Sequence, residues 1–345
     1  MSTLVGALVV GVAGLLVGSG AWPMKIMRKY QFEHWWFLGC FLGFMVGPWA
    51  VTLVGCPNAF DGYRSVGLPL LLKANVFSLG WGIANILCGL CFVRIGFALT
   101  GGILTGLGVS LGVTIPMIFK GSGLFSGAPD IGSPAGRTVL VGVAIMLAGV
   151  VLVSLAGFGR DKALKTSTRP ASGSFGVGLI MVVIAGVLSV GMSFSFVYSQ
   201  GPIVAAMKAR GAGDVPANFA VWAVGLLAGA GINVLYPAYL MPKNKSWHVL
   251  GETWRDALLS LLIGTYTIVG VPLMGKGMLL LGVLGASVGF GIQQAAQMLG
   301  NQSVGFISGE WREVHGTPKM QMYAAIAILI VAALVMAYGN SLAKS

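Results

Sequence analysis

The sequence predicts an all-helical integral membrane protein, and three observations lead to that prediction. Of its 345 residues, 56% are hydrophobic and only 9% are charged, whereas soluble domains carry about 25% charged residues. The apolar residues form runs of about 20, which is the length a helix needs to cross a bilayer. The net charge is +12, and the Lys and Arg residues stand between the runs, as at cytoplasmic membrane edges. We therefore expect lipid to be the solvent for most of the chain and expect no nucleic-acid partner.

The apolar runs predict ten transmembrane helices within one membrane transport domain, residues 1–345. No polar segment between the runs is long enough to form a core of its own. The first run lacks a basic region before it and exceeds the usual length of a signal-peptide core, so we expect it to be retained as a helix. The ten runs are 3–24, 35–55, 70–93, 97–119, 138–159, 175–199, 217–241, 257–281, 284–307 and 321–341.

The distribution of basic residues predicts the orientation in the membrane. The connections after the first, third, fifth, seventh and ninth runs carry most of the Lys and Arg residues. Lys25, Arg28 and Lys29 follow the first run directly. Because cytoplasmic loops carry an excess of positive charge, we expect these connections in the cytoplasm and both termini outside, on the periplasmic or extracellular side of the membrane.

Similar patterns in the two halves of the chain indicate an internal repeat. Ala13-Gly14 in the first run matches Ala185-Gly186 in the sixth, and both stand within apolar stretches. With halves of approximately 1–165 and 170–345, each half holds five runs. Five is an odd number, so the second copy must insert upside down relative to the first. This 5+5 inverted repeat is typical of secondary transporters, whose substrate site lies near the midplane between the halves.

Polar side chains within the runs are the candidate binding residues. Amides offer both donors and acceptors to hydroxyl groups, and an aromatic face can stack on a sugar ring. We expect Asn75 and Asn233 to form interhelical hydrogen bonds, the ordinary role of such residues in membranes. The predicted substrate-binding residues are Trp81, Asn85, Tyr198, Gln200, Tyr266, Gln293, Gln294 and Gln297.

The chain has no obvious proton-coupling residue. None of its nine carboxylates falls inside a predicted run, although many proton-coupled carriers use a membrane-buried Asp or Glu. Lys276 is the coupling candidate, with two readings. It is a loop charge if the helix breaks at Gly275–Gly277; otherwise it is a cavity-facing group whose lowered pKa lets it exchange a proton.

The sequence gives little support to an enzyme. Gly285-Ala286-Ser287-Val288-Gly289 fits the G-x-S-x-G nucleophile pattern, but it lies in an apolar run without a preceding strand. Cys88-x-x-Cys91 lacks a second pair or a nearby His, so we expect two packed cysteines rather than a redox or zinc site. We therefore predict no enzyme activity, no cofactor and no metal.

The following segments stand in this order along the chain: Pro48-Trp49-Ala50, Pro57-Asn58, Trp81-Gly82-Ile83-Ala84-Asn85, Gly136-Arg137, Gly191-Met192-Ser193-Phe194-Ser195 and Glu310-Trp311. Together they resemble the L-rhamnose–proton symporter family of the drug/metabolite transporter superfamily. The resemblance implies a ten-helix carrier that imports a 6-deoxy sugar such as L-rhamnose with a proton across a bacterial inner membrane. It would work by alternating access, as a monomer or homodimer in membrane lipid. The coupling species remains open between a proton, another ion and none. The alternative is an exporter or facilitator of another small polar solute on the same fold.

Overall fold

The computed structural model describes residues 2–94, 97–119, 129–163, 175–282, 285–309 and 311–342, and all regular structure among them is helical. The shorter helices are η1 (Trp22–Ile26), α4 (Ala59–Val66) and α11 (Val249–Glu252). Two segments contain a π-helix: α2 (Phe32–Cys40), η2 (Phe41–Val46) and α3 (Gly47–Gly55); and α9 (Asp214–Ala220), η4 (Val221–Gly225) and α10 (Leu227–Lys243). The long helices are α1 (Ser2–Ser19), α5 (Leu68–Arg94), α6 (Phe97–Ile118), α7 (Pro134–Ala163), α8 (Phe175–Lys208), α12 (Trp254–Leu281), α13 (Gly285–Ile307) and α14 (Thr317–Leu342).

Helical structure covers each of the ten predicted runs, but fewer helices meet the length and hydropathy expected of a membrane span. In the described part of the chain seven do so, or eight when the bent pair Asp214–Gly225 and Leu227–Lys243 is counted as one span. Within α6, the apolar helix Ile103–Ile118 is shorter than a candidate membrane span. Helix α13 is not among the candidate spans, and it carries several polar amide side chains. The described part of the chain thus forms an all-helical bundle with seven to eight candidate spans.

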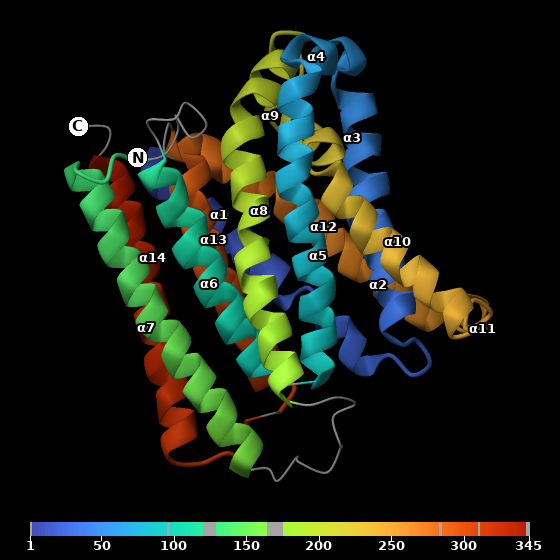
Figure 1. Ribbon diagram of the computed structural model, residues 1–345, viewed down its shortest axis with the longest axis vertical. Helices are drawn as coiled ribbons and strands as arrows, with labels where there is room; N and C mark the ends of the chain where they lie inside the picture. Colours follow the sequence, from blue (N-terminus) through green and yellow to red (C-terminus); the bar gives the residue numbers. More distant parts are fainter. Residues whose placement is uncertain are drawn as a thin grey trace.

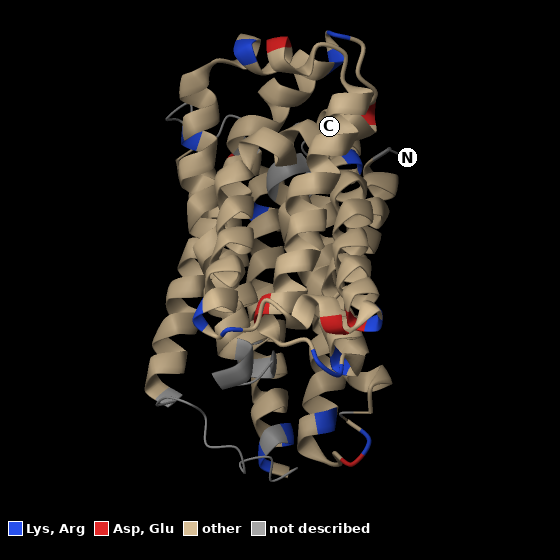
Figure 2. Ribbon diagram, turned by 90° about the vertical axis from the view of Figure 1, so that its right-hand side faces the viewer, with Lys and Arg blue, Asp and Glu red and all other residues tan. Residues whose placement is uncertain are grey.

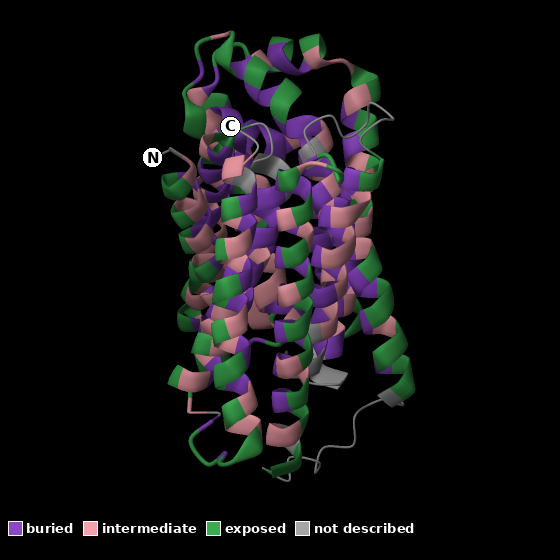
Figure 3. Cartoon of the chain, turned by 90° about the vertical axis from the view of Figure 1, so that its left-hand side faces the viewer, coloured by how far each residue is buried: buried purple, intermediate pink, exposed green. Residues whose placement is uncertain are grey.

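The helices form one bundle in which segments far apart in the sequence lie side by side (Figure 1). Helix α1 packs against α12 and α13, and α8 packs against α5 and α6. Similarly, α7 and α13 contact α6 and α14, α2 contacts α12, and α10 contacts α5. The outer faces of the helices are largely exposed and the inner faces are buried (Figure 3), as expected for a bundle solvated by lipid.

Asn75 supports a sharp bend in the segment α9–η4–α10. The helix axes on either side of Leu226 differ in direction by 62°, and a bend frees backbone groups that need new partners. The Asn75 side chain donates to the carbonyl of Val224 at 2.7 Å and accepts from the N–H of Ala228 at 2.8 Å. Asn233 accepts from Trp36 at 3.1 Å. Both predicted interhelical hydrogen bonds are therefore confirmed.

Two carboxylates expected in connections lie instead in the first turns of long helical segments. Glu33 in α2 is 4% exposed and accepts hydrogen bonds from Asn244 and Ser246. Asp256 in α12 is 0% exposed. The sequence interpretation placed them outside the helices because it could not anticipate that neighbouring loops supply their hydrogen-bond donors. Most other charged residues lie near the two ends of the bundle (Figure 2).

Asp256 fixes the loop that follows η1. Its Oδ2 accepts hydrogen bonds from the backbone N–H groups of Arg28, Lys29 and Tyr30 at 3.0, 2.7 and 3.1 Å. Burial, and then the charge of Asp256, raises the pKa of the Tyr30 hydroxyl, which itself donates to the carbonyl of Leu250. These contacts hold η1, a lining element of the cavities described below, against the start of α12.

We expect Asp256→Ala to lower the free energy of unfolding by at least about 3 kcal/mol, because each hydrogen bond to a charged group contributes about 1.5–3 kcal/mol. Thermal unfolding of the purified protein in detergent measures the change. Asp61→Ala is the control, since the only contact described for the Asp61 side chain is an exposed ion pair with Arg64, whose loss should cost less than about 1 kcal/mol. Equal melting temperatures for the two variants would contradict the structural role of Asp256.

Candidate functional site

A cavity of about 130 Å³ lies in the interior of the bundle, between elements from both halves of the chain. Helices α5, α6 and α8 line it together with α1, α12 and α13, and each π-helix contributes one aromatic ring. None of its described lining residues is charged. We call it the central cavity. Its lining residues are Val17, Phe44, Trp81, Asn85, Leu104, Ser189, Met192, Trp222, Thr267, Gly270, Val271, Met274, Phe290, Gln293, Gln294 and Gln297.

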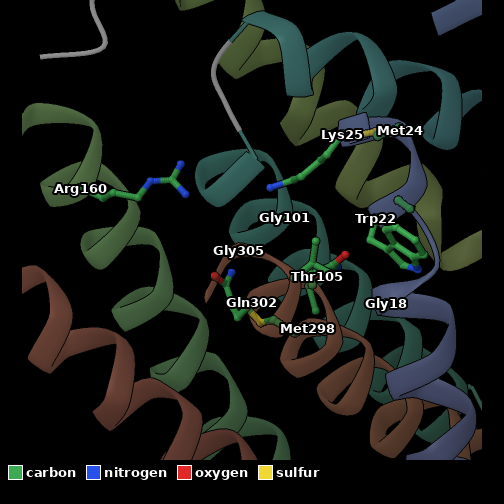
Figure 4. A pocket seen from close by; sticks show the side chains of 13 residues that line it. Gly18, Trp22, Met24, Lys25, Gly101, Thr105, Arg160, Met298, Gln302 and Gly305 are labelled. Carbon is green, nitrogen blue, oxygen red and sulfur yellow. The ribbon is translucent and has the colours of Figure 1, made fainter. Parts of the chain in front are cut away.

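The central cavity continues toward one end of the bundle. An adjoining cavity of about 220 Å³ shares Asn85, Thr267 and Gln297 with it and also contacts Tyr266. A third cavity, which shares Thr105 and Asn301 with the second, lies at the end of the bundle where α1 and α7 finish. In this outer cavity the side chains of Lys25 and Arg160 reach inward from η1 and α7 (Figure 4). The three cavities form a path from that end to the middle of the bundle.

Aromatic side chains make one wall of the central cavity. The rings of Phe44 and Trp222, from the two π-helices, are stacked with centroids 5.8 Å apart. Trp81 meets both of them edge-on, at 5.2 and 5.7 Å, and Phe196 packs behind Trp222. π-helical turns in long helices are often found at functional sites. Here they turn an aromatic ring of each half toward the same cavity.

Amide side chains make another wall. Asn85, one turn after Trp81 on α5, is half-buried, and its side chain forms no hydrogen bond with the described part of the protein. On α13, Gln293 Nε2 donates to Gln297 Oε1 at 2.7 Å. Gln294, on the same helix, also lines the cavity and lies near Ser189 of α8, since both side chains are close to Gly108. Five of the predicted binding residues, Trp81, Asn85, Gln293, Gln294 and Gln297, therefore meet in one cavity.

Tyr266 lies nearby, in the adjoining cavity rather than the central one. Its hydroxyl accepts a hydrogen bond from Trp22 Nε1 at 3.1 Å. Because Trp22 belongs to η1, this bond connects the outer part of the path to α12. Tyr266, which lines the adjoining cavity, is therefore bonded to a residue that lines the outer cavity.

Tyr198 and Gln200, two further predicted binding residues, do not line any of the three cavities described above. Gln200 is 4% exposed and donates to Asn218 Oδ1 at 3.0 Å, and the ring of Tyr198 contacts Phe77. Both lie about two turns beyond Met192 along α8, toward the end where α9 packs. The contacts given for both side chains are thus with other side chains of the protein.

Lys276 does not face a cavity. Helix α12 continues through Gly275–Gly277 to Leu281, so the interpretation of Lys276 as a charge in a loop between two helices is wrong. The side chain is exposed on the outer surface of the helix, while the neighbouring residues Gly275 and Gly277 are buried. The face that carries Lys276 is thus opposite to the one that packs inside the bundle.

Sequence reasoning missed the apolar and aromatic part of the central cavity. Phe44, Trp222, Met274 and Phe290 were not predicted to line a site, since large apolar residues occur throughout this chain. Phe44 and Trp222 belong to the two π-helices, and Met274 and Phe290 belong to α12 and α13. No sequence pattern predicts a π-helix in an apolar run, so the structure was needed to find them.

Comparisons with known proteins identify the family. The family model described as L-rhamnose-proton symport protein matches residues 4–252. The chain is similar to proteins named L-rhamnose-proton symporter from Yersinia pestis bv. Antiqua (strain Antiqua), Yersinia pestis (strain Pestoides F) and Yersinia pseudotuberculosis serotype O:1b (strain IP 31758). Each is 29% identical over 237 residues, which cover 67% of this chain and 66% of the relative.

The aligned region spans just under two thirds of these relatives' own length. All three are named as symporters and not as enzymes, which agrees with the prediction that this chain is not an enzyme. The family match ends before α12 begins, so Tyr266 and the amides of α13 lie beyond it, whereas Trp81 and Asn85 lie within it. Because the family model covers more than half of the chain, this protein belongs to the L-rhamnose–proton symport protein family.

Proposed function

We propose that the chain is a secondary transporter that imports a 6-deoxy sugar, L-rhamnose or a close relative, together with a proton, by alternating access. The observation that carries the proposal is the central cavity, where Trp81 and Asn85 lie with Gln293 and Gln297. Among the described residues, the Asn85 amide has no hydrogen-bond partner and no lining residue is charged. A neutral sugar presents hydroxyl groups to amides and a less polar ring face to an indole. The family membership supports a sugar and a proton as the solutes.

The packing of the helices supports a 5+5 inverted repeat as the basis of alternating access. If α1 corresponds to α8 and the later segments follow in order, several of the main contacts between helices have a counterpart when the two halves are exchanged. Thus α12 and α13 pack on α1 as α5 and α6 pack on α8, and α13 meets α14 as α6 meets α7. The second segment of each half contains a π-helix, η2 or η4. The central cavity lies between these halves, as in other transporters of this plan.

The path of cavities supports an inward-open state. It reaches the end of the bundle marked by Lys25 and Arg160, which the excess of basic residues places in the cytoplasm. Toward the other end, Gln200, Asn218 and the α12 backbone at Gly275 pack closely. Because Lys276 is exposed, we do not assign the coupling of the proton to it.

Counterflow of labelled sugars in proteoliposomes tests the proposal. We expect unlabelled L-rhamnose trapped inside to drive accumulation of labelled L-rhamnose, and an inward proton gradient to increase net uptake. Uptake that ignores the gradient would favour the alternative, a facilitator on the same fold. Failure of every 6-deoxy sugar to compete would remove the substrate assignment, and liposomes without protein provide the background rate.

A further inference from the structure

Gln293 carries a buried acceptor that the protein leaves unused. The side chain is 2% exposed and lines the central cavity. Its Nε2 donates to Gln297, but its Oε1 is buried and accepts no hydrogen bond from any described group. Folded proteins rarely leave such an oxygen without a donor, because its loss of hydration is then uncompensated. An acceptor of this kind in a cavity indicates a donor that arrives with a ligand.

The bond between Gln293 and Gln297 determines what the pair can offer. It occupies one N–H of Gln293 and one acceptor position of Gln297. The groups left for a ligand include the Oε1 acceptor of Gln293 and the N–H groups of Gln297, which have no described partner, on side chains one helical turn apart. Two hydroxyl groups on neighbouring carbon atoms match this arrangement. One hydroxyl donates to Gln293 Oε1, and its neighbour accepts from Gln297 Nε2.

The backbone beneath the pair is held in place by α1. A Cβ atom at Gly14 would lie 2.4 Å from the carbonyl oxygen of Gln293, and one at Gly18 would lie 2.0 Å from that of Gln297. The two glycines therefore let the backbone of α1 rest on α13 at these residues. Contact between backbones leaves α13 little freedom to rotate, so the two amides are presented at a fixed place in the cavity.

We infer that Gln293 and Gln297 form a specificity-determining pair that recognises a vicinal diol of a neutral polyol. The inference rests on the proposed function of the central cavity as a sugar site. It adds that recognition of the hydroxyl pattern comes from α13, beyond residue 252, where the match to the family model ends. The part of the chain that matches the family model provides Trp81 and Asn85, and α13, which lies beyond the match, selects the diol.

A cycle that combines protein variants with deoxygenated ligands tests this pair. Binding to purified protein is measured for a panel of neutral polyols that includes L-rhamnose, and for analogues that lack one hydroxyl of a vicinal diol. The wild type should bind the matching monodeoxy analogue about tenfold or more weakly than its parent, as expected for a buried amide left unpaired. In Gln293→Met the parent and the analogue should bind within about twofold of each other.

Thermal unfolding separates recognition from a structural role. Gln293→Met removes the bond to Gln297 but also the unpartnered oxygen, and Met fills a similar volume, so the melting temperature without ligand should be unchanged or higher. Ser303→Ala, at an exposed position of α13, is the control and should keep both the affinity and the tenfold discrimination. A clear fall in the melting temperature of Gln293→Met would overturn the inference in favour of a structural bond.

The remaining outcomes distinguish the inference from the proposed function. If L-rhamnose binds but Gln293→Met discriminates against the deoxy analogue as strongly as the wild type, the diol pair is wrong and the sugar site stands. If another polyol binds in place of L-rhamnose and Gln293→Met loses its hydroxyl discrimination, the pair is supported and the rhamnose assignment falls. If no neutral polyol binds the wild type, both are overturned.

Discussion

Gly18→Ala is expected to separate α1 from α13 and to abolish ligand binding in the central cavity. The added Cβ would lie 2.0 Å from the carbonyl oxygen of Gln297 and 2.7 and 2.9 Å from the carbonyl carbon and Cα of the same residue. All three are backbone atoms, so no change of rotamer relieves the overlap. Overpacking of this kind typically lowers the free energy of unfolding by about 1–3 kcal/mol. The accompanying shift of the backbone would also move the amides that bind the ligand.

Gly11→Ala is the matched control on the same helix. Nothing lies within 4 Å of a Cβ at Gly11, and alanine favours a helix over glycine by about 1 kcal/mol. Thermal unfolding and sugar binding should therefore be unchanged or slightly improved in Gly11→Ala and strongly impaired in Gly18→Ala. If both variants behaved alike, the close crossing of α1 and α13 would not be needed for the fold or the site.

The fold class follows from composition because the physical constraint is strong. A chain with so few charges can satisfy its backbone in lipid only as helices or a closed barrel, and runs of this length select helices. Positions of the runs were also predictable, since each coincides with helical structure. The bend at Leu226 and the π-helices were not predictable, because they depend on contacts between helices, such as that of Asn75 with Val224.

The candidate site was predictable only in part. Asn85 and Gln293 could be found because an unexplained amide in an apolar run is rare enough to indicate a role. Gln200 looked equivalent in the sequence, yet its partner Asn218 lies on α9 and satisfies its amide inside the protein. The role of Lys276 could not be predicted for a similar reason. The exposed and buried faces of α12 are distinguished only by the packing of α1 against it.

Asn85→Ala is expected to abolish sugar binding without changing the stability of the protein, and Asn75→Ala is expected to do the reverse. The two residues lie on α5 and have the same side chain. Asn85 forms no described hydrogen bond and faces the central cavity, so its removal leaves no protein group unpaired. Asn75 bonds to the carbonyl of Val224 and the N–H of Ala228, and its removal should cost about 2–4 kcal/mol.

Melting temperatures with and without sugar measure both effects in one experiment, because a ligand stabilises only the state that binds it. The melting temperatures of wild type and Asn75→Ala should both rise when sugar is added, but without sugar Asn75→Ala should melt at a lower temperature than wild type. Asn85→Ala should start at the wild-type value and show no rise. A normal rise in Asn85→Ala would mean that its unpaired amide is not used by the ligand. In that case the aromatic wall and the α13 amides would have to bind the sugar alone, and a single half of the bundle would supply the polar contacts that we assign to both.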